Sequence, residues 1–264
     1  RRKKMIEINK IHNMDCIEGL KLMEDKSVDL VITDPFYVPK AQFEWETYDK
    51  WYWNWNKEWL SEIKRVLKDD FHLLISFSSD DMAKFEMLLK EIGFNIKSRM
   101  VWNYRNSCKA VAKNTKFAKT YEFIFHCSSG KQLNFSDKWD EKRFDVQVCA
   151  IPQSNFKEGK YHQYQKPLRL WKMLIEFASN KGDLVLDPFM GSGTTAIVCK
   201  QLKRNFVGFE IKKEYIDISN KRLNETVADL NPYQESLIIA KSDKSSEDLP
   251  SPETTVSASP ARSI

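Results

Sequence analysis

The spacing of apolar positions along the chain alternates between the pattern of a buried strand and that of an amphipathic helix. Short apolar runs predict strands at residues 28–33, 73–77, 121–125, 184–186 and 205–209. Apolar residues three and four positions apart predict helices at residues 55–67, 82–92, 166–177, 194–202 and 213–223. Strands that alternate with helices in this way form a mainly parallel sheet covered on both faces. We therefore predict an α/β fold with a doubly wound sheet.

The regular pattern is interrupted in the middle of the chain. Residues 131–160 are irregular and polar, with Pro152 and Gly159 as breakers. We therefore expect one domain in two halves, with an insertion between them and a flexible Ser/Pro-rich tail. The boundaries that we expect are 1–98 for the first half, 99–160 for the insertion, 161–235 for the second half and 236–264 for the tail.

Composition sets limits on the class of protein. A chain of 264 residues that is 42% hydrophobic can form one α/β domain with an insertion. No run of 18 uncharged apolar residues predicts a membrane span, and the basic start leads into no secretory signal. The five cysteines are widely spaced, which disfavours disulfides and zinc and favours a reducing cytoplasm. The four histidines show no ligand spacing, so we expect no metal.

The positive charge is unevenly distributed. The whole chain carries +5, but residues 99–172 contain 15 Lys or Arg against 6 Asp or Glu. Such an excess is the electrostatic footprint of a phosphate-binding surface. A solvated basic face is the alternative, and charge alone does not distinguish the two.

A glycine loop follows the strand predicted at residues 184–186. Asp187 stands at the end of this strand, the edge at which open α/β sheets bind ligands, and Gly191 and Gly193 allow a tight turn. The next strand ends at Glu210, which is placed to accept hydrogen bonds from ribose hydroxyls. The loop lacks the lysine of a phosphate-binding loop, and its carboxylate favours a cationic ligand. The segment predicts a site for S-adenosylmethionine; a plain strand-to-helix turn is the alternative.

The strand at residues 28–33 leads into Asp34-Pro35-Phe36-Tyr37. The amino nitrogen of a nucleic-acid base is a weak nucleophile, because its lone pair is delocalised into the ring. A site that methylates it needs acceptors for the N–H groups and a flat surface for the ring. Asp34 and the Pro35 carbonyl provide acceptors, while Tyr37 can stack on the base and Phe36 adds apolar shielding. An ordinary turn with core aromatics is the alternative.

Together the two segments resemble the amino-group DNA methyltransferases. That family carries Asp-Pro-Pro-Tyr or Ser-Pro-Pro-Tyr as its catalytic tetrapeptide, and its cofactor loop is similar to residues 187–195. The order, with the tetrapeptide first and the loop after the insertion, resembles the β class. The resemblance covers about residues 6–224, and Phe36 departs from it because the family has a second proline there. It implies S-adenosylmethionine-dependent methylation of adenine N6, since Asp34 and not serine stands first, on a base flipped out of the duplex.

Three further segments resemble the same family. Residues 13–16 are similar to the turn beside the cofactor's adenine, 162–167 to the segment near its methionine part, and 65–68 to a helix end. The predicted catalytic residues are Asp34, Pro35, Phe36 and Tyr37. The predicted cofactor-binding residues are Asp15, Cys16, Asp34, Lys166, Asp187, Pro188, Phe189, Gly191, Gly193, Thr194 and Glu210.

The insertion is the predicted DNA-binding region. Basic residues interleaved with aromatics suit phosphate contact and stacking on bases; a basic surface with Trp102 in the core is the alternative. The predicted DNA contacts are Arg99, Arg105, Lys109, Lys113 and Lys116. Residues 131–160 are the candidate target-recognition segment. The tryptophan-rich residues 43–59 are expected in the core or at a subunit contact, with the part before Trp55 as a candidate lid.

Other functions stay open at this point. They are cytosine N4 methylation, a DNA-binding methyltransferase-like subunit with impaired catalysis, and methylation of RNA or a protein amide. Double-stranded DNA is the expected partner, with a cognate restriction endonuclease and a second copy of the chain as candidates. We expect a DNA-associated protein of a bacterial or phage cytoplasm.

Overall fold

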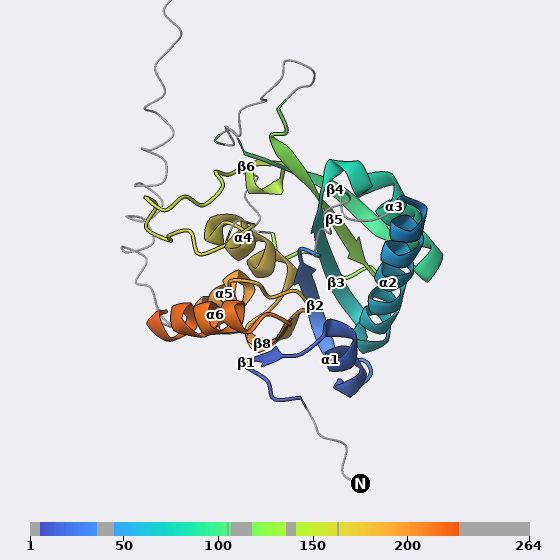
Figure 1. Cartoon of the computed structure of the whole chain (residues 1–264), viewed down its shortest axis with the longest axis horizontal. Coiled ribbons are helices and arrows are strands. Elements are labelled where there is room, and N and C mark those ends of the chain that lie inside the picture. The colour runs from blue at the N-terminus through green and yellow to red at the C-terminus, as the bar shows by residue number, and fades with distance from the viewer. Residues whose placement is uncertain are drawn as a thin grey trace, which may run out of the picture. The chain divides into compact units, whose positions relative to one another are not determined.

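A single sheet forms the centre of the protein (Figure 1). The structure, a computed structural model, describes residues 6–35, 45–104, 106, 118–135, 141–162 and 164–226. Within these residues, eight strands lie in the order β1-β8-β7-β2-β3-β5-β4-β6. The strands are β1 (Lys10–Asn13), β2 (Val28–Thr33), β3 (Leu67–Phe77), β4 (Ile96–Asn103), β5 (Tyr121–Ser128), β6 (Val146–Val148), β7 (Leu184–Asp187) and β8 (Asn205–Glu210). Among the described strands, only β5 runs antiparallel to its neighbours. This confirms the mainly parallel α/β fold.

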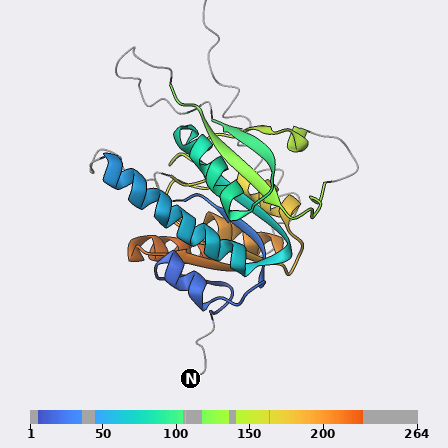
Figure 2. The same ribbon diagram turned by 90° about the vertical axis from the view of Figure 1, so that its right-hand side faces the viewer.

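Helices cover both faces of the sheet (Figures 1 and 2). One face carries α1 (Cys16–Leu22), α2 (Trp45–Val66) and α3 (Met82–Ile92), and the other carries α4 (Leu168–Ala178), α5 (Thr194–Leu202) and α6 (Lys213–Glu225). Two short 3-10 helices, η2 (Ser79–Asp81) and η3 (Glu141–Arg143), complete the described elements. No helix among them is long and apolar enough to cross a membrane.

The residues of β2 alternate between two hydrophobic cores. Val31 packs with the core under α1, α2 and α3, whereas Leu30 and Ile32 pack with the core under α4 and α5. Because both faces of this strand are buried, its sequence is an almost continuous apolar run instead of an alternating one.

The strand order reverses between β2 and β7, at the centre of the sheet. β2 pairs with β7 through Leu30 and Val31 and continues on its other side to β3, while β7 continues to β8. Ligands of open α/β sheets bind outside the carboxyl ends of the strands at such a reversal. The segments that follow β2 and β7 therefore meet here, although they are far apart in the chain.

Several element boundaries differ from the prediction. α2 begins at Trp45, so residues 45–54 are its first turns and not a separate lid segment. Asn56 helps to hold these turns, because its amide donates to the Tyr52 carbonyl and its oxygen accepts from the Trp59 indole. β3 begins at Leu67, and four elements were not predicted, namely β1, α1, β4 and β6. Residues 36–44, the rest of the candidate lid, and the tail 236–264 lie outside the described residues.

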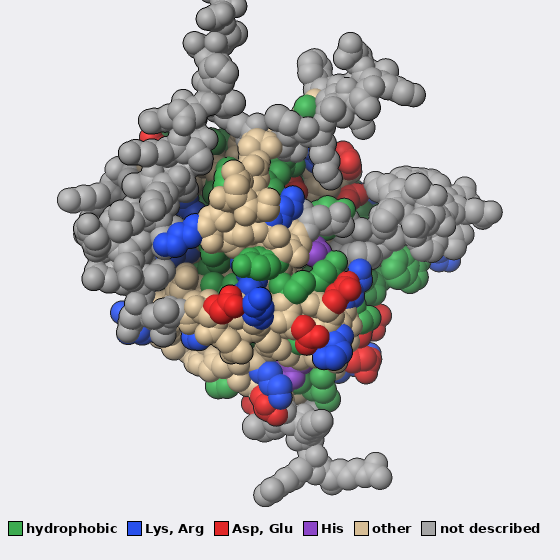
Figure 3. Space-filling view, turned by 60° about the vertical axis from the view of Figure 1, so that its left-hand side comes forward, with side chains coloured by type: hydrophobic (Ala, Val, Ile, Leu, Met, Phe, Trp, Pro, Cys, Tyr) green, Lys and Arg blue, Asp and Glu red, His purple; other side chains and the backbone are tan. Residues whose placement is uncertain are grey.

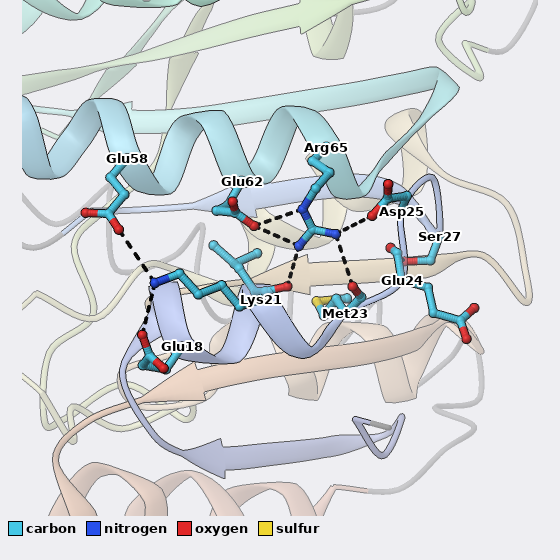
Figure 4. Close-up of polar contacts among 10 residues, drawn as sticks. Glu18, Lys21, Met23, Glu24, Asp25, Ser27, Glu58, Glu62 and Arg65 are labelled. Atoms are coloured by element: carbon cyan, nitrogen blue, oxygen red, sulfur yellow. Dashed lines mark hydrogen bonds and ion pairs between the residues drawn. The ribbon is translucent and has the colours of Figure 1, made fainter. Parts of the chain in front are cut away.

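Arg65, near the end of α2, ties this helix to α1 (Figure 4). Its guanidinium donates to the carbonyls of Leu20 at 2.7 Å and Met23 at 3.1 Å, near the end of α1. It also bonds to Glu62 at 2.7 Å and to Asp25 at 2.5 Å. Carbonyls at a helix end have no partner inside the helix, so Arg65 satisfies groups that would otherwise need water.

A histidine pair is buried between β3 and β5. His72 Nδ1 and His126 Nε2 are 2.9 Å apart, and the two rings are 0% and 5% exposed. Burial lowers the pKa of both rings, in the case of His126 to about 4. Both rings are therefore neutral at neutral pH, and one of the two facing nitrogens donates to the other.

Candidate active site

Asp34 follows β2 directly, and its carboxylate lies against Lys166. Asp34 Oδ2 is 2.6 Å from Lys166 Nζ, and 14% of the Asp34 side chain is exposed. Pro35, next in the chain, is buried. Phe36 and Tyr37, the other two predicted catalytic residues, lie outside the described residues. The carboxylate is thus held at the centre of the sheet edge and is still partly accessible.

Lys166, just before α4, lies between two carboxylates. Its Nζ is 2.6 Å from Asp34 and 2.9 Å from Glu122 Oε2, and 5.4 Å from the centre of the Trp102 ring. Burial alone would lower the pKa of this ammonium, but Asp34 and Glu122 together raise it above the ordinary lysine value. Lys166 therefore stays charged. The sequence predicts it as a cofactor contact, whereas the structure places its ammonium on the predicted catalytic carboxylate.

Asp187, at the end of β7, connects the two central strands. Its Oδ1 accepts from the Thr33 hydroxyl at 2.8 Å and from the Phe189 N–H at 3.1 Å, and its Oδ2 accepts from Thr195 at 2.5 Å. Burial raises the Asp187 pKa to about 6, and the donated hydrogen bonds oppose this shift. The side chain is 4% exposed. It therefore fixes the glycine loop to β2, with both oxygens already occupied by protein donors.

The glycine loop after β7 needs its two glycines for different reasons. Gly191 has a φ of 53°, and its N–H donates to the carboxylate of Glu210 at 2.9 Å. Gly193 has a φ of 83°, and a Cβ on it would lie 2.6 Å from the Cβ of Ser219 on α6. Gly193 therefore permits both the left-handed turn and the close approach of α6. Thr194, which starts α5, donates to the Lys166 carbonyl at 3.3 Å.

Two carboxylates lie at the ends of β8 and β1, which are neighbours in the sheet. Glu210 accepts from the N–H groups of Gly191 and Lys212, both at 2.9 Å, and Asp15 caps α1. Neither forms an ion pair within the described part of the chain, so both can accept from neutral hydroxyl or amino groups. These acceptors beside a glycine loop fit the ribose and adenine of S-adenosylmethionine. Cys16 is buried, which raises its thiol pKa to about 12, so the thiol stays protonated.

Phe189 links the glycine loop to α2. Its ring lies 5.1 Å from Trp59 and 5.5 Å from Trp55, measured between ring centres. Pro188, just before it, is buried. The described ring contacts of Phe189 are therefore with α2, and they connect the start of the glycine loop to that helix.

Of the five predicted DNA contacts, only Arg99 lies among the described residues. Arg99, on β4, forms two hydrogen bonds with Glu86 of α3, at 2.6 and 3.0 Å, so its charge is balanced. On the face seen in Figure 3, the acidic and basic side chains of the described residues are intermixed. The other four predicted contacts, which lie outside the described residues, are Arg105, Lys109, Lys113 and Lys116.

Sequence reasoning did not single out Glu122, Thr33 or Thr195. The signal for Glu122 was available, because a carboxylate within the apolar strand Tyr-Glu-Phe-Ile-Phe favours an oppositely charged partner. Nothing in the local sequence identifies that partner as Lys166, which comes from a distant segment.

A family profile described as DNA methylase, N6_N4_Mtase, matches residues 28–221. This range includes the strand before Asp34, the Lys166 segment and the glycine loop. It extends through β8 into α6, and so covers both halves of the site.

Individual proteins are similar over most of the chain. The Type II methyltransferase M.HinfI of Haemophilus influenzae is 29% identical, over 83% of this chain and 69% of its own length. The DNA adenine methyltransferase YhdJ of Escherichia coli (strain K12) is 31% identical, over 83% of each chain. The crystal structure of the M1.HpyAVI–SAM complex superposes with a TM-score of 0.66 at 28% identity, over 81% of this chain and 98% of that one.

Proposed function

The chain belongs to the DNA methylase family, and we propose that it transfers a methyl group from S-adenosylmethionine to N6 of an adenine in double-stranded DNA. One observation carries this proposal: Asp34 and the glycine loop lie at the carboxyl ends of adjacent central strands, joined by the Thr33–Asp187 hydrogen bond. The acceptor of the methyl group and its donor would therefore meet at one point of the sheet.

S-adenosylmethionine would supply the methyl group: the amino nitrogen would form the new C–N bond with its lone pair as the C–S bond breaks, and the sulfur would keep that electron pair. Asp34 and the Pro35 carbonyl would accept from the N–H groups of the amino nitrogen, which would localise its lone pair towards the methyl group. The methylated nitrogen is acidic and would lose one proton, which the Asp34 carboxylate could accept. Tyr37 would stack on the flipped base.

Cofactor binding is proposed for the loop and the two carboxylates beside it. Glu210 is oriented by two backbone N–H groups and would accept from the ribose hydroxyls, and Asp15 would face the adenine. Asp187 would act indirectly, because its described hydrogen bonds fix the loop to β2. Gly191, Gly193 and Thr194 would allow the close approach of the methionine part.

Adenine is favoured over cytosine as the target. Asp34 stands where the cytosine N4 enzymes mostly have serine, and YhdJ, to which the chain is similar, is named a DNA adenine methyltransferase. Digesting the product DNA to nucleosides distinguishes N6-methyladenine from N4-methylcytosine. N4-methylcytosine alone would refute the adenine assignment.

The decisive experiment is to express the chain in a methylation-free bacterial host and to sequence the genomic DNA for modified bases. We expect N6-methyladenine at one sequence motif, absent from cells that express Asp34→Ala. Unmodified DNA, with purified protein that binds S-adenosylmethionine and DNA but transfers no label, would instead identify a binding subunit with impaired catalysis. Label in RNA or protein but not in DNA would also refute the proposal.

The remaining proposals concern partners and location. The insertion would contact DNA through Arg105, Lys109, Lys113 and Lys116, since residues 99–172 hold the basic excess of the chain. A cognate restriction endonuclease, a second copy of the chain and the cytoplasm are proposed on the resemblance to restriction–modification enzymes.

A further inference from the structure

The acidic residue Glu122 lies on β5, on the same face of the sheet as the aromatic ring of Trp102. The two residues are direct partners in the β4–β5 pairing, and side chains of such partners project from one face. Glu122 Oε2 accepts from the Ser76 hydroxyl at 3.3 Å and pairs with Lys166 Nζ at 2.9 Å. Glu122 thus lies at the site, paired with the same ammonium as Asp34.

The Lys166 segment is fixed from the cofactor side. The Lys166 carbonyl accepts from Thr194 of the glycine loop, and Gln165 is buried and donates to the Gly159 carbonyl at 3.0 Å. The Lys166 side chain is 7% exposed, and its ammonium lies over Trp102. The ammonium therefore has a defined place, between Asp34 on one side and Glu122 on the other.

We infer that Lys166 and Glu122 are positioning residues for methyl transfer: Glu122 holds the Lys166 ammonium, and the ammonium in turn holds the Asp34 carboxylate in the orientation that meets the substrate amino group. This inference rests on the proposed function. The three side chains carry a net charge of −1, which complements the positive charge that the sulfonium brings and that develops on the amino nitrogen. Without Lys166, the Asp34 and Glu122 carboxylates would lose the cation that lies between them and would repel each other.

The charged and titratable groups around this cluster come from several elements. Asp34 follows β2, Glu122 lies on β5, and Tyr104 follows β4 with its pKa raised to about 12 by burial and by Glu122. Asp187 on β7 is bonded to Thr33, which precedes Asp34. His162 also interacts with Lys166, and burial is the main reason why its pKa is lowered.

The test compares Glu122→Gln, Lys166→Met and Lys166→Arg with the wild type. The rate of labelled methyl transfer to duplex DNA is measured in a single turnover, with saturating cofactor and DNA, together with KM for each. We expect Glu122→Gln to slow transfer about tenfold and Lys166→Met about a hundredfold, with KM for S-adenosylmethionine changed less than about threefold. Lys166→Arg should lie between Lys166→Met and the wild type.

Lys68→Met is the matched control. Lys68 Nζ pairs with Asp29 Oδ1 at 2.6 Å, at the opposite end of the sheet from the site. Its loss removes an ion pair of the same length, although with a more exposed lysine, far from the site, so transfer by this variant should stay within about twofold of the wild type. If Lys166→Met does not fold, as judged by thermal unfolding, Glu122→Gln and Lys166→Arg decide the question.

A positioning residue that acts through Asp34 has a non-additive effect. Glu122→Gln should therefore slow Asp34→Asn no further. Three results would overturn the inference: transfer by Glu122→Gln at the wild-type rate, a raised KM for S-adenosylmethionine as the main effect of Lys166→Met, or an equal slowing by Glu122→Gln in the Asp34→Asn background. If the wild-type chain methylates no DNA, the proposed function is refuted. If the wild type is active and the variants match its rate, only the inference about Lys166 and Glu122 is refuted.

Discussion

Gly193→Ala should destabilise the protein through two separable effects. The first is backbone strain, because a side chain at a φ of 83° costs about 1 kcal/mol. The second is a clash, since the new Cβ would lie 2.6 Å from the Ser219 Cβ and 3.1 Å from its Cα. Overpacking of a buried contact costs about 1–3 kcal/mol. The free energy of unfolding should therefore fall by about 2–4 kcal/mol in total.

Gly182→Ala is the matched control for the first effect. Gly182 has a φ of 86°, and a Cβ on it would meet no atom within 4 Å. Urea unfolding of both variants, followed by circular dichroism, should show a loss of only about 1 kcal/mol for Gly182→Ala. The difference between the two variants measures the clash with α6.

Ser219→Gly provides an independent check, because it removes the side chain that the new methyl group meets. Gly193→Ala should destabilise the Ser219→Gly background less than the wild type, by an amount close to the clash. Relief of the clash also moves the loop that carries the Gly191 N–H, so cofactor affinity should fall, and each 1.4 kcal/mol lost raises Kd about tenfold. Equal losses for Gly193→Ala and Gly182→Ala, with additive effects in the double variant, would refute this reasoning.

Three further outcomes are expected. Arg65→Met removes charge-assisted hydrogen bonds to α1, so it should lower the free energy of unfolding in urea by about 2 kcal/mol. Methyl transfer per folded molecule should stay the same, and unchanged stability would contradict the role given to Arg65. Glu210→Gln should raise the calorimetric Kd for S-adenosylmethionine about tenfold with little effect on transfer at saturation, whereas unaltered affinity would exclude the ribose contact. The unfolded His126 ring binds a proton below a pH of about 6.5 and the folded ring only below about 4, so its contribution to stability should fall by about 2 kcal/mol between pH 7 and pH 5. Because the raised pKa of Asp187 acts in the opposite direction, the measurement compares wild type and His126→Gln, and parallel pH profiles would refute it.

The central strands and most helices were predictable from the sequence, because their patterns are local. β2 is an apolar run that Asp34 follows, β7 is an apolar run that ends at Asp187, and α3 ends before Gly93 as predicted, with a left-handed φ of 89° at that glycine. β6 has only three residues and two exposed valines, so no apolar pattern marks it. The early start of α2 was missed because closely spaced aromatic residues between Trp45 and Trp55 obscure the helical spacing of apolar positions.

The site was predictable in its parts but not in its connections. Asp34, the glycine loop and Glu210 each follow a strand, and parallel strands bring their carboxyl ends to one edge. The pairing of Lys166 with Asp34 and Glu122 depends on three segments that meet only in the folded sheet. A sequence pattern reports which residues are charged, but not which opposite charge lies within 3 Å of them.

The pairing of β2 with β7 has a consequence for how the chain is made. Until residues 184–187 leave the ribosome, β2 has no partner strand on one side. All six residues of β2 are buried in the folded protein, so this edge is mostly apolar. Such an edge is a template for association with other chains. Shortened products that stop before β7 should therefore aggregate more readily than the full chain.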